Sequence, residues 1–257
     1  MNLYVDTHIH IYDEEFDRDR GESIKRAIEA GVTKMIMPGI DSTVHSAMMK
    51  CASDYPDTLF PCAGLHPTSV KQDWKKEISI LEERLSKERY YGVGEAGMDG
   101  YWSKEFLSEQ KEAFGIQIEL ASKYDLPVII HSREATEEIF EVLERYRNLS
   151  FKGIFHAFSG SIETYRRLLT FGDFWFGIGG VITYKNSNLP VTVKQMDINR
   201  IILETDAPWL TPVPHRGSRN EASYIPHIAA KIAQVKEMEI EEVAEVTSGN
   251  AKNLFKL

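Results

Sequence analysis

Histidine and carboxylate residues stand near the ends of several short apolar runs in this sequence. The first are His8 and His10, which are separated by two positions in the run LYVDTHIH. Because side chains alternate along an extended strand, both imidazoles would point the same way and could reach one metal ion. Two buried histidines bonded to the backbone would give the same pattern, so the pair alone does not decide the matter.

Residues of the same types follow the other apolar runs. His66, His131 and His156 lie in the last part of three further predicted strands, whereas His45 and His227 fall on predicted helices. Carboxylates at corresponding positions are Asp6, Glu95, Asp99, Glu204 and Asp206, and His215 lies in the loop after the last strand. Histidines that only pack in a core would not gather at strand ends, so this placement predicts an active site there.

The set of side chains predicts a metal centre. Imidazole nitrogen and carboxylate oxygen suit zinc, manganese and related ions, whereas magnesium prefers oxygen. The candidate ligands are too many for one tetrahedral ion, and they divide naturally between two divalent ions: His8, His10, Glu95, His131, His156 and Asp206. Two ions about 4 Å apart can clamp a phosphate and activate a water molecule. Glu95 is the best candidate for a bridging ligand, because it ends the fourth strand near the middle of the set.

Two carboxylates have further expected roles. Asp206 follows the apolar run RIILET and could bind metal and also accept a proton from the attacking water, so Asp206 and Glu95 are the predicted catalytic residues. A helix N-cap is the alternative for Asp206, but Pro208 follows too closely. Glu204, two residues earlier, is expected to orient a metal-bound histidine rather than to bind an ion.

Four side chains are candidates for substrate contact. Arg133 and the pair Arg216 and Arg219 carry planar guanidinium groups that can donate several hydrogen bonds to a phosphate. Structural ion pairs are the alternative for all three. His66, next to Pro67, is expected to contact a phosphate or a water at the metal centre.

Strands and helices alternate along the chain, and this order would place these residues together. The predicted strands cover residues 3–10, 32–39, 58–67, 90–99, 126–133, 151–160, 173–182 and 199–208, and helical periodicity marks residues 74–87, 105–124 and 133–147. A short helix is expected within residues 188–197 and a last one over residues 240–257. Eight such units predict a single (β/α)8 barrel domain over residues 1–257, with a doubly wound open sheet as the competing topology.

Composition sets limits on the protein class. The chain has 257 residues, 42% of them hydrophobic and 27% charged, which are ordinary values for a packed globular protein. No apolar run could span a membrane and no secretory signal is visible, so a cytoplasmic location is expected, with Cys51 and Cys62 as free buried thiols.

The net charge of -9 argues against broad adhesion to nucleic acid but not against a phosphate ester substrate. A monomer is expected.

Seven ordered blocks give a specific resemblance over the whole chain. They are DTHIH at 6–10, GLHP at 64–67, GEAGMD at 94–99, HSR at 131–133, HAFSG at 156–160, ILETDAPWL at 202–210 and PHRGSRNE at 214–221. The chain resembles the TatD family of metal-dependent deoxyribonucleases, within the wider amidohydrolase-like barrels. The resemblance implies that His8, His10, Glu95 and Asp206 hold one divalent ion, and that Glu95, His131 and His156 hold the second. It also implies hydrolysis of DNA phosphodiesters, on single strands or from 3′ ends.

The sequence departs from the family pattern at three positions. Ala96 and Gly100 change the block around the fourth strand, and Ala222 replaces the proline that commonly ends the last block. Tyr101 and Trp102 follow Gly100, where an aromatic ring could stack on a base or pack on a neighbouring helix. These changes alter the surroundings of the predicted site and bear on its substrate preference.

Two other functions are compatible with this set of residues. One is an amidohydrolase-like enzyme that hydrolyses a small-molecule or aminoacyl ester or amide. Many such enzymes use a carboxylated lysine on the fourth strand, where this chain has Glu95. The other is an inactive metal-binding scaffold, which is disfavoured because every ligand position holds a competent residue.

Overall fold

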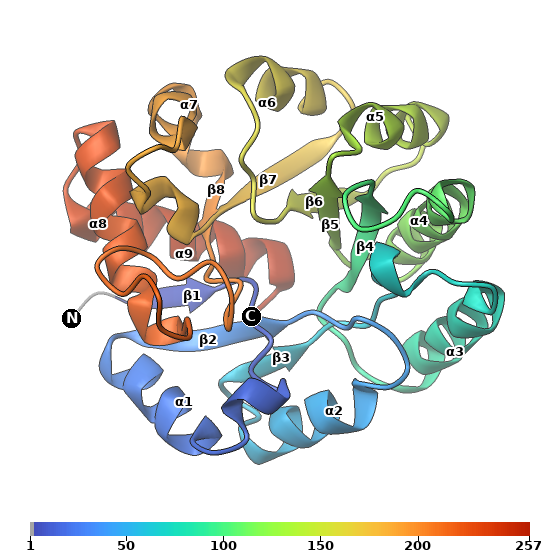
Figure 1. The fold of residues 1–257 in the computed structure, drawn as a ribbon, viewed down its shortest axis with the longest axis horizontal. Coiled ribbons are helices and arrows are strands. Elements are labelled where there is room, and N and C mark those ends of the chain that lie inside the picture. The colour runs from blue at the N-terminus through green and yellow to red at the C-terminus, as the bar shows by residue number, and fades with distance from the viewer. Residues whose placement is uncertain (1–2) are drawn as a thin grey trace.

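The apolar runs form eight parallel strands within residues 3–257, the part of the chain that the computed structural model describes. They are β1 (Tyr4–Asp6), β2 (Val32–Met37), β3 (Leu59–Pro61), β4 (Val93–Asp99), β5 (Val128–Arg133), β6 (Lys152–Phe155), β7 (Asp173–Ile178) and β8 (Ile201–Leu203). Figure 1 shows these strands inside a ring of helices. Strands such as β3 and β8 are buried throughout, as their continuous apolar sequences predict.

The helices follow the strands and pack their apolar faces inward. They are α1 (Arg20–Glu29), α2 (His45–Asp54), α3 (Trp74–Lys87), α4 (Leu107–Lys123), α5 (Thr136–Arg145), α6 (Ile162–Leu168), α7 (Leu189–Gln195), α8 (Ile225–Lys236) and α9 (Ile240–Phe255). In α3 the buried residues Trp74, Ile78, Leu81 and Leu85 recur at three- and four-residue spacing. The predicted bounds of this helix are confirmed, and the helices expected near residues 105–124, 133–147, 188–197 and 240–257 are present.

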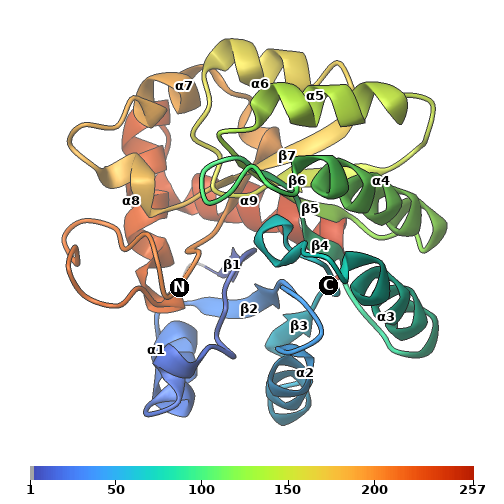
Figure 2. The same cartoon turned by 45° about the vertical axis from the view of Figure 1, so that its right-hand side comes forward.

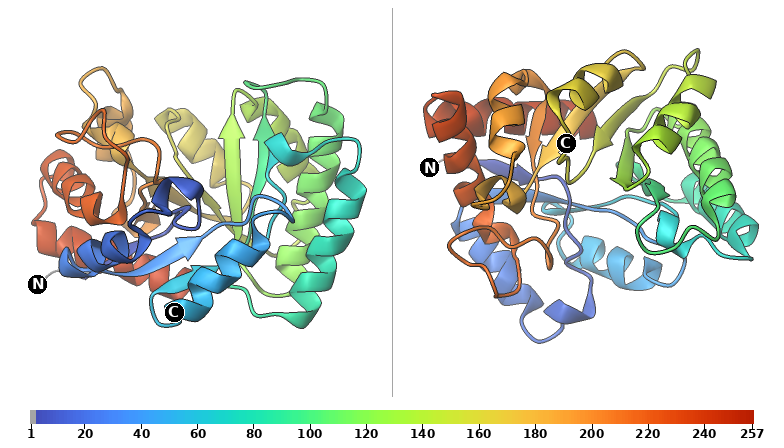
Figure 3. Two further views of the ribbon diagram at one scale, coloured as in Figure 1. Left: turned by 60° about the horizontal axis from the view of Figure 1, so that its bottom comes forward. Right: turned by 45° about the horizontal axis from the view of Figure 1, so that its top comes forward.

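The strands pair in sequence order around the molecule. β1, β2 and β3 form one ladder, and β4 to β8 form a second. Single parallel bridges join the two ladders at both seams, Ala63 with Val93 and Ile9 with Ala207. Figure 3 (left) shows β4 and β5 side by side and pointing the same way. The order is that of a (β/α)8 barrel, and the open doubly wound sheet is excluded because its strand order would not follow the sequence.

The last helix closes the end of the barrel opposite to the strand carboxyl ends. Leu254 and Phe255 of α9 pack in one apolar cluster with strand residues that include Val5, Ile36 and Ile202. Figures 1 and 2 show α9 beside β1 and β8. Because α9 fills this end, the opposite end is left for polar side chains.

Several strands are shorter than predicted, and this corrects the placement of the histidines. Among His8, His10, His66, His131 and His156, only His131 lies within a strand, and the others lie in the loops that follow β1, β3 and β6. The apolar pattern runs on past each strand because these loops are themselves buried. No helix within residues 3–257 is long and apolar enough to cross a membrane.

Candidate metal centre

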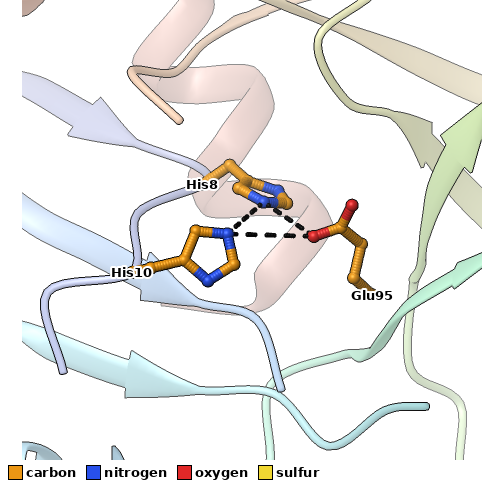
Figure 4. Close-up of side chains that lie close together, drawn as sticks. All are labelled: His8, His10 and Glu95. Atoms are coloured by element: carbon orange, nitrogen blue, oxygen red, sulfur yellow. Dashed lines mark hydrogen bonds and ion pairs between the residues drawn. The ribbon is translucent and has the colours of Figure 1, made fainter. Parts of the chain in front are cut away.

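The carboxylate of Glu95, on β4, lies at the centre of the histidine cluster. One of its oxygens, Oε2, lies 3.1 Å from Nε2 of His8 and 3.8 Å from Nε2 of His10. The two histidine nitrogens are 3.2 Å apart. Figure 4 shows both imidazoles converging on this oxygen. These three side chains form the first group of ligand atoms.

The other oxygen of Glu95, Oε1, faces a second group of histidines. It lies 2.7 Å from Nδ1 of His131, 2.7 Å from Nε2 of His156 and 3.2 Å from Nε2 of His66. His66 was expected to contact substrate, and the structure places its ring against this group as well. The two oxygens of one carboxylate therefore face two groups of histidines, which touch where the rings of His8 and His156 stack with centres 4.0 Å apart.

The spacing within each group fits a bound cation. Ligand atoms at about 2.0–2.1 Å from a tetrahedral zinc ion are roughly 3.3 Å from one another. The three ligand atoms of His8, His10 and Glu95 lie within 4.8 Å of one another, and so do those of His66, Glu95 and His131. Burial would raise the pKa of Glu95, but the nearby histidines outweigh it and hold the pKa well below its usual range. Glu95 is thus ionised and could serve as an anionic ligand.

A fixed tautomer prepares His10 to bind a cation. The Tyr12 hydroxyl lies 2.6 Å from the carbonyl oxygen of Pro38 and 2.8 Å from Nδ1 of His10. A carbonyl can only accept, so the hydroxyl donates to Pro38 and its oxygen accepts the proton on Nδ1. In the neutral ring the lone pair is therefore on Nε2 of His10, which faces Glu95. Tyr12 was not among the predicted site residues, although it lies only two residues after His10 in the same loop.

Asp99 holds His131 in a comparable way. Its Oδ2 lies 2.9 Å from Nε2 of His131, so Nδ1 is turned toward Glu95. Burial would lower the pKa of His131, but Asp99 and Glu95 outweigh it and raise the pKa to about 9. From the sequence, Asp99 was identified only as a carboxylate near the end of a predicted strand. Its position four residues after Glu95, on the same face of β4, was the available signal for this role.

Asp206, in the loop after β8, adds a second carboxylate to the group of His8, His10 and Glu95. Its Oδ1 lies 3.6 Å from Nε2 of His8 and 3.7 Å from Nε2 of His10. The backbone of Asp206 has φ of 57°, a conformation that L residues rarely adopt and that recurs at functional sites. Its side chain is 15% exposed, compared with 4% for Glu95. Asp206 is thus the more accessible carboxylate of the two.

Glu204, expected to orient a histidine, has a carboxylate oxygen within 4.8 Å of ring nitrogens of His8 and His156. Its Oε1 accepts the backbone N–H of Ala157, the residue after His156. The carboxylate fits beneath β7 because a Cβ on Gly177 would lie only 1.9 Å from Oε2. Burial raises the pKa of Glu204 well above its usual range, with the charge of Asp206 as a further cause. Glu204 therefore supports the loop that carries His156.

The three predicted arginines lie in different settings. Arg133, at the end of β5, has its guanidinium carbon 3.7 Å from the centre of the Tyr101 ring. Arg216, in the loop after β8, stacks on the ring of Tyr184. The guanidinium of Arg219 makes two bonds to Asp19, at 2.7 and 2.9 Å, and so ties this loop to α1. The alternative of a structural ion pair is therefore seen at Arg219, and Arg133 and Arg216 are exposed.

A parallel α/β barrel with histidines and carboxylates converging at the carboxyl ends of its strands defines the class of metal-dependent hydrolases. Comparison with known proteins gives the family. The family model described as TatD related DNase matches residues 5–256, and the chain belongs to this TatD family.

Named relatives agree with this class. The chain is 37% identical over 256 residues to the uncharacterized metal-dependent hydrolase YabD of Bacillus subtilis, covering 99% of this chain and 100% of YabD. It is 31% identical to the 3′-5′ ssDNA/RNA exonuclease TatD of Erwinia tasmaniensis, covering 98% of this chain and 99% of that protein. The crystal structure of YjjV, a TatD homolog from Escherichia coli, matches with a TM-score of 0.91 at 28% identity and covers 99% of this chain and 98% of YjjV.

Proposed function

We propose that this chain hydrolyses phosphodiester bonds of single-stranded DNA from the 3′ end, with two divalent cations bridged by Glu95. The observation that carries this proposal is the arrangement around the two carboxylate oxygens of Glu95. Oε2 faces His8 and His10, and Oε1 faces His131 and His156. The relative from Erwinia tasmaniensis is named as an exonuclease of this polarity. Zinc, manganese and magnesium are the candidate ions.

The protein residues have distinct proposed roles in this reaction. Bound divalent cations would lower the pKa of a water molecule and neutralise charge on the phosphate. Burial would raise the pKa of Asp206, but the neighbouring histidines, His10 foremost, outweigh it and hold the pKa below its usual range. Asp206 is therefore ionised and can accept the proton of the attacking water.

Contacts to the substrate would come from the surrounding loops. Arg133 and Arg216 are exposed, and each has guanidinium N–H groups available for phosphate oxygens. His66 lies at the edge of the second histidine group, 3.3 Å from His131, so it can contact either a cation or the substrate. Arg219 would have to leave Asp19 to do the same, so we assign its main role to the loop.

The test is an activity screen of the metal-stripped full chain. Single-stranded DNA, duplex DNA, RNA and a set of small esters are each incubated with zinc, manganese or magnesium added separately. We expect shortening of single-stranded DNA from its 3′ end with at least one ion and none in a chelator. Hydrolysis of the small esters with every nucleic acid left intact would overturn the nuclease proposal and favour the small-molecule hydrolase.

A further inference from the structure

Exposed aromatic side chains gather beside the metal centre. Among the described residues, the large apolar side chains with high exposure include three aromatic ones, Tyr101 (49%), Trp102 (69%) and Trp209 (48%). All three lie in the loops that follow β4 and β8, at the barrel end that carries the histidine cluster. Exposed aromatic rings at one functional end are more than the scattered surface apolar residues that any protein shows.

The side chains of Tyr101, Trp102 and Arg133 lie against one another, and we call this group the aromatic platform. The rings of Tyr101 and Trp102 meet edge to face with centres 5.1 Å apart. The Arg133 guanidinium lies 3.7 Å from the centre of the Tyr101 ring and 5.6 Å from that of Trp102. Aromatic rings and a guanidinium plane are the groups on which unpaired bases stack in proteins that bind single strands.

Asp99 connects the aromatic platform to the metal centre. Its Oδ1 accepts the backbone N–H groups of Tyr101 and Trp102 at 2.9 and 3.0 Å, while its Oδ2 bonds the ring of His131. Gly100 allows this sharp path, since a Cβ there would lie 2.6 Å from the Glu134 carbonyl oxygen. Asp99 therefore links the backbone of the aromatic platform directly to His131, a candidate metal ligand.

We propose that the aromatic platform is a nucleobase-binding subsite, where an unpaired base of the substrate strand stacks on Trp102 while Arg133 contacts the backbone. The proposal rests on the proposed function for the identity of the substrate strand. A base in this subsite would hold the adjoining phosphate near Glu95. The platform takes any base, because stacking uses the face of the base rather than its hydrogen-bonding edge.

The test separates base binding from phosphate binding. Binding of a short oligothymidylate and of an abasic oligonucleotide with the same number of phosphates is measured by fluorescence anisotropy, with the full chain in a chelator so that neither is cut. We expect the wild-type chain to bind the oligothymidylate at least about fivefold more tightly. In Trp102→Ala this preference disappears, and in Trp102→Phe most of it remains. Equal affinity of the wild-type chain for both oligonucleotides, or an unchanged preference in Trp102→Ala, would overturn the subsite.

Val191→Ala is the matched control, because Val191 is 65% exposed but lies on α7 away from the platform. It should leave both affinities unchanged. Cleavage of the same oligothymidylate by the metal-loaded wild-type chain is measured separately. If the strand stays intact, the proposed function fails, while the binding comparison still decides the subsite. If it is cut, Trp102→Ala should raise KM at least about fivefold and leave kcat nearly unchanged.

Discussion

The carboxylate of Asp99 lies 2.9 Å from Nε2 of His131 and thereby fixes which nitrogen of that ring faces Glu95. Residues that orient a metal-bound histidine in this way also raise its basicity. In the metal-free chain the same contact favours the protonated ring, and the pKa of His131 is raised to about 9. A proton and a cation therefore compete for His131.

This competition predicts proton release when a divalent ion binds. Below pH 9 the ring of His131 is protonated before binding, so the ion must displace about one proton, and affinity at this site should rise about tenfold per pH unit up to pH 9 and then level off. Calorimetry in buffers of different protonation enthalpy measures the number of protons. His8, whose pKa burial lowers to about 4, should release none at neutral pH. In Asp99→Asn we expect less release, and an unchanged value there would contradict the argument.

The bridging position of Glu95 predicts unequal losses of metal within the cluster. Glu95→Ala removes a ligand atom from both groups and leaves two cations facing each other with less negative charge between them, so both sites should weaken. His156→Ala should deplete chiefly the second site and His10→Ala the first. Metal analysis of the purified variants, each checked for folding by circular dichroism, measures the ions per chain. Two ions retained by Glu95→Ala while either histidine variant loses both would show that Glu95 does not bridge.

The hydrogen bond between Tyr12 and His10 predicts a positioning role for the tyrosine. Tyr12→Phe removes the acceptor of the Nδ1 proton, so the His10 ring should populate both tautomers and affinity at the first site should fall about 10-fold. The 15N chemical shifts of His10 in the metal-free protein report the tautomer directly. Tyr90→Phe is the control, because its hydroxyl bonds Glu88 outside the cluster. Unchanged shifts in Tyr12→Phe would exclude this role.

Arg133 offers a test of substrate contact apart from metal binding. Arg133→Ala should reduce kcat/KM on a phosphodiester by roughly 10- to 100-fold, since a hydrogen bond to a charged group contributes about 1.5–3 kcal/mol. Metal content should stay at the wild-type value. Arg219→Ala is the comparison, because loss of its bonds to Asp19 should lower thermal stability more than it lowers activity. Loss of both ions from Arg133→Ala would show instead that Arg133 supports the ligands.

The local sequence determined the alternation of strands and helices, because each element leaves its own periodicity. Residues Trp74–Lys87 form a helix with the predicted bounds, since the apolar spacing that marks it is complete within the segment. The candidate ligands were identified for the same reason: residues at the carboxyl ends of parallel strands meet at one end of a barrel in any sequence with this order.

Contacts between distant segments were decided only by the tertiary structure. The apolar pattern of Ile9 and Ala207 does not show where β1 and β8 end, because both residues are buried after the strands and pair across a seam. The ion pair of Arg219 with Asp19 joins residues 200 positions apart in the chain. The hydrogen bond from the Ala157 backbone to Glu204 joins residues 47 positions apart. A side chain's type tells what it can bond, but its partner is set by packing. Neither the tautomer of His10 nor the contact of Asp99 with His131 could therefore be predicted from the sequence.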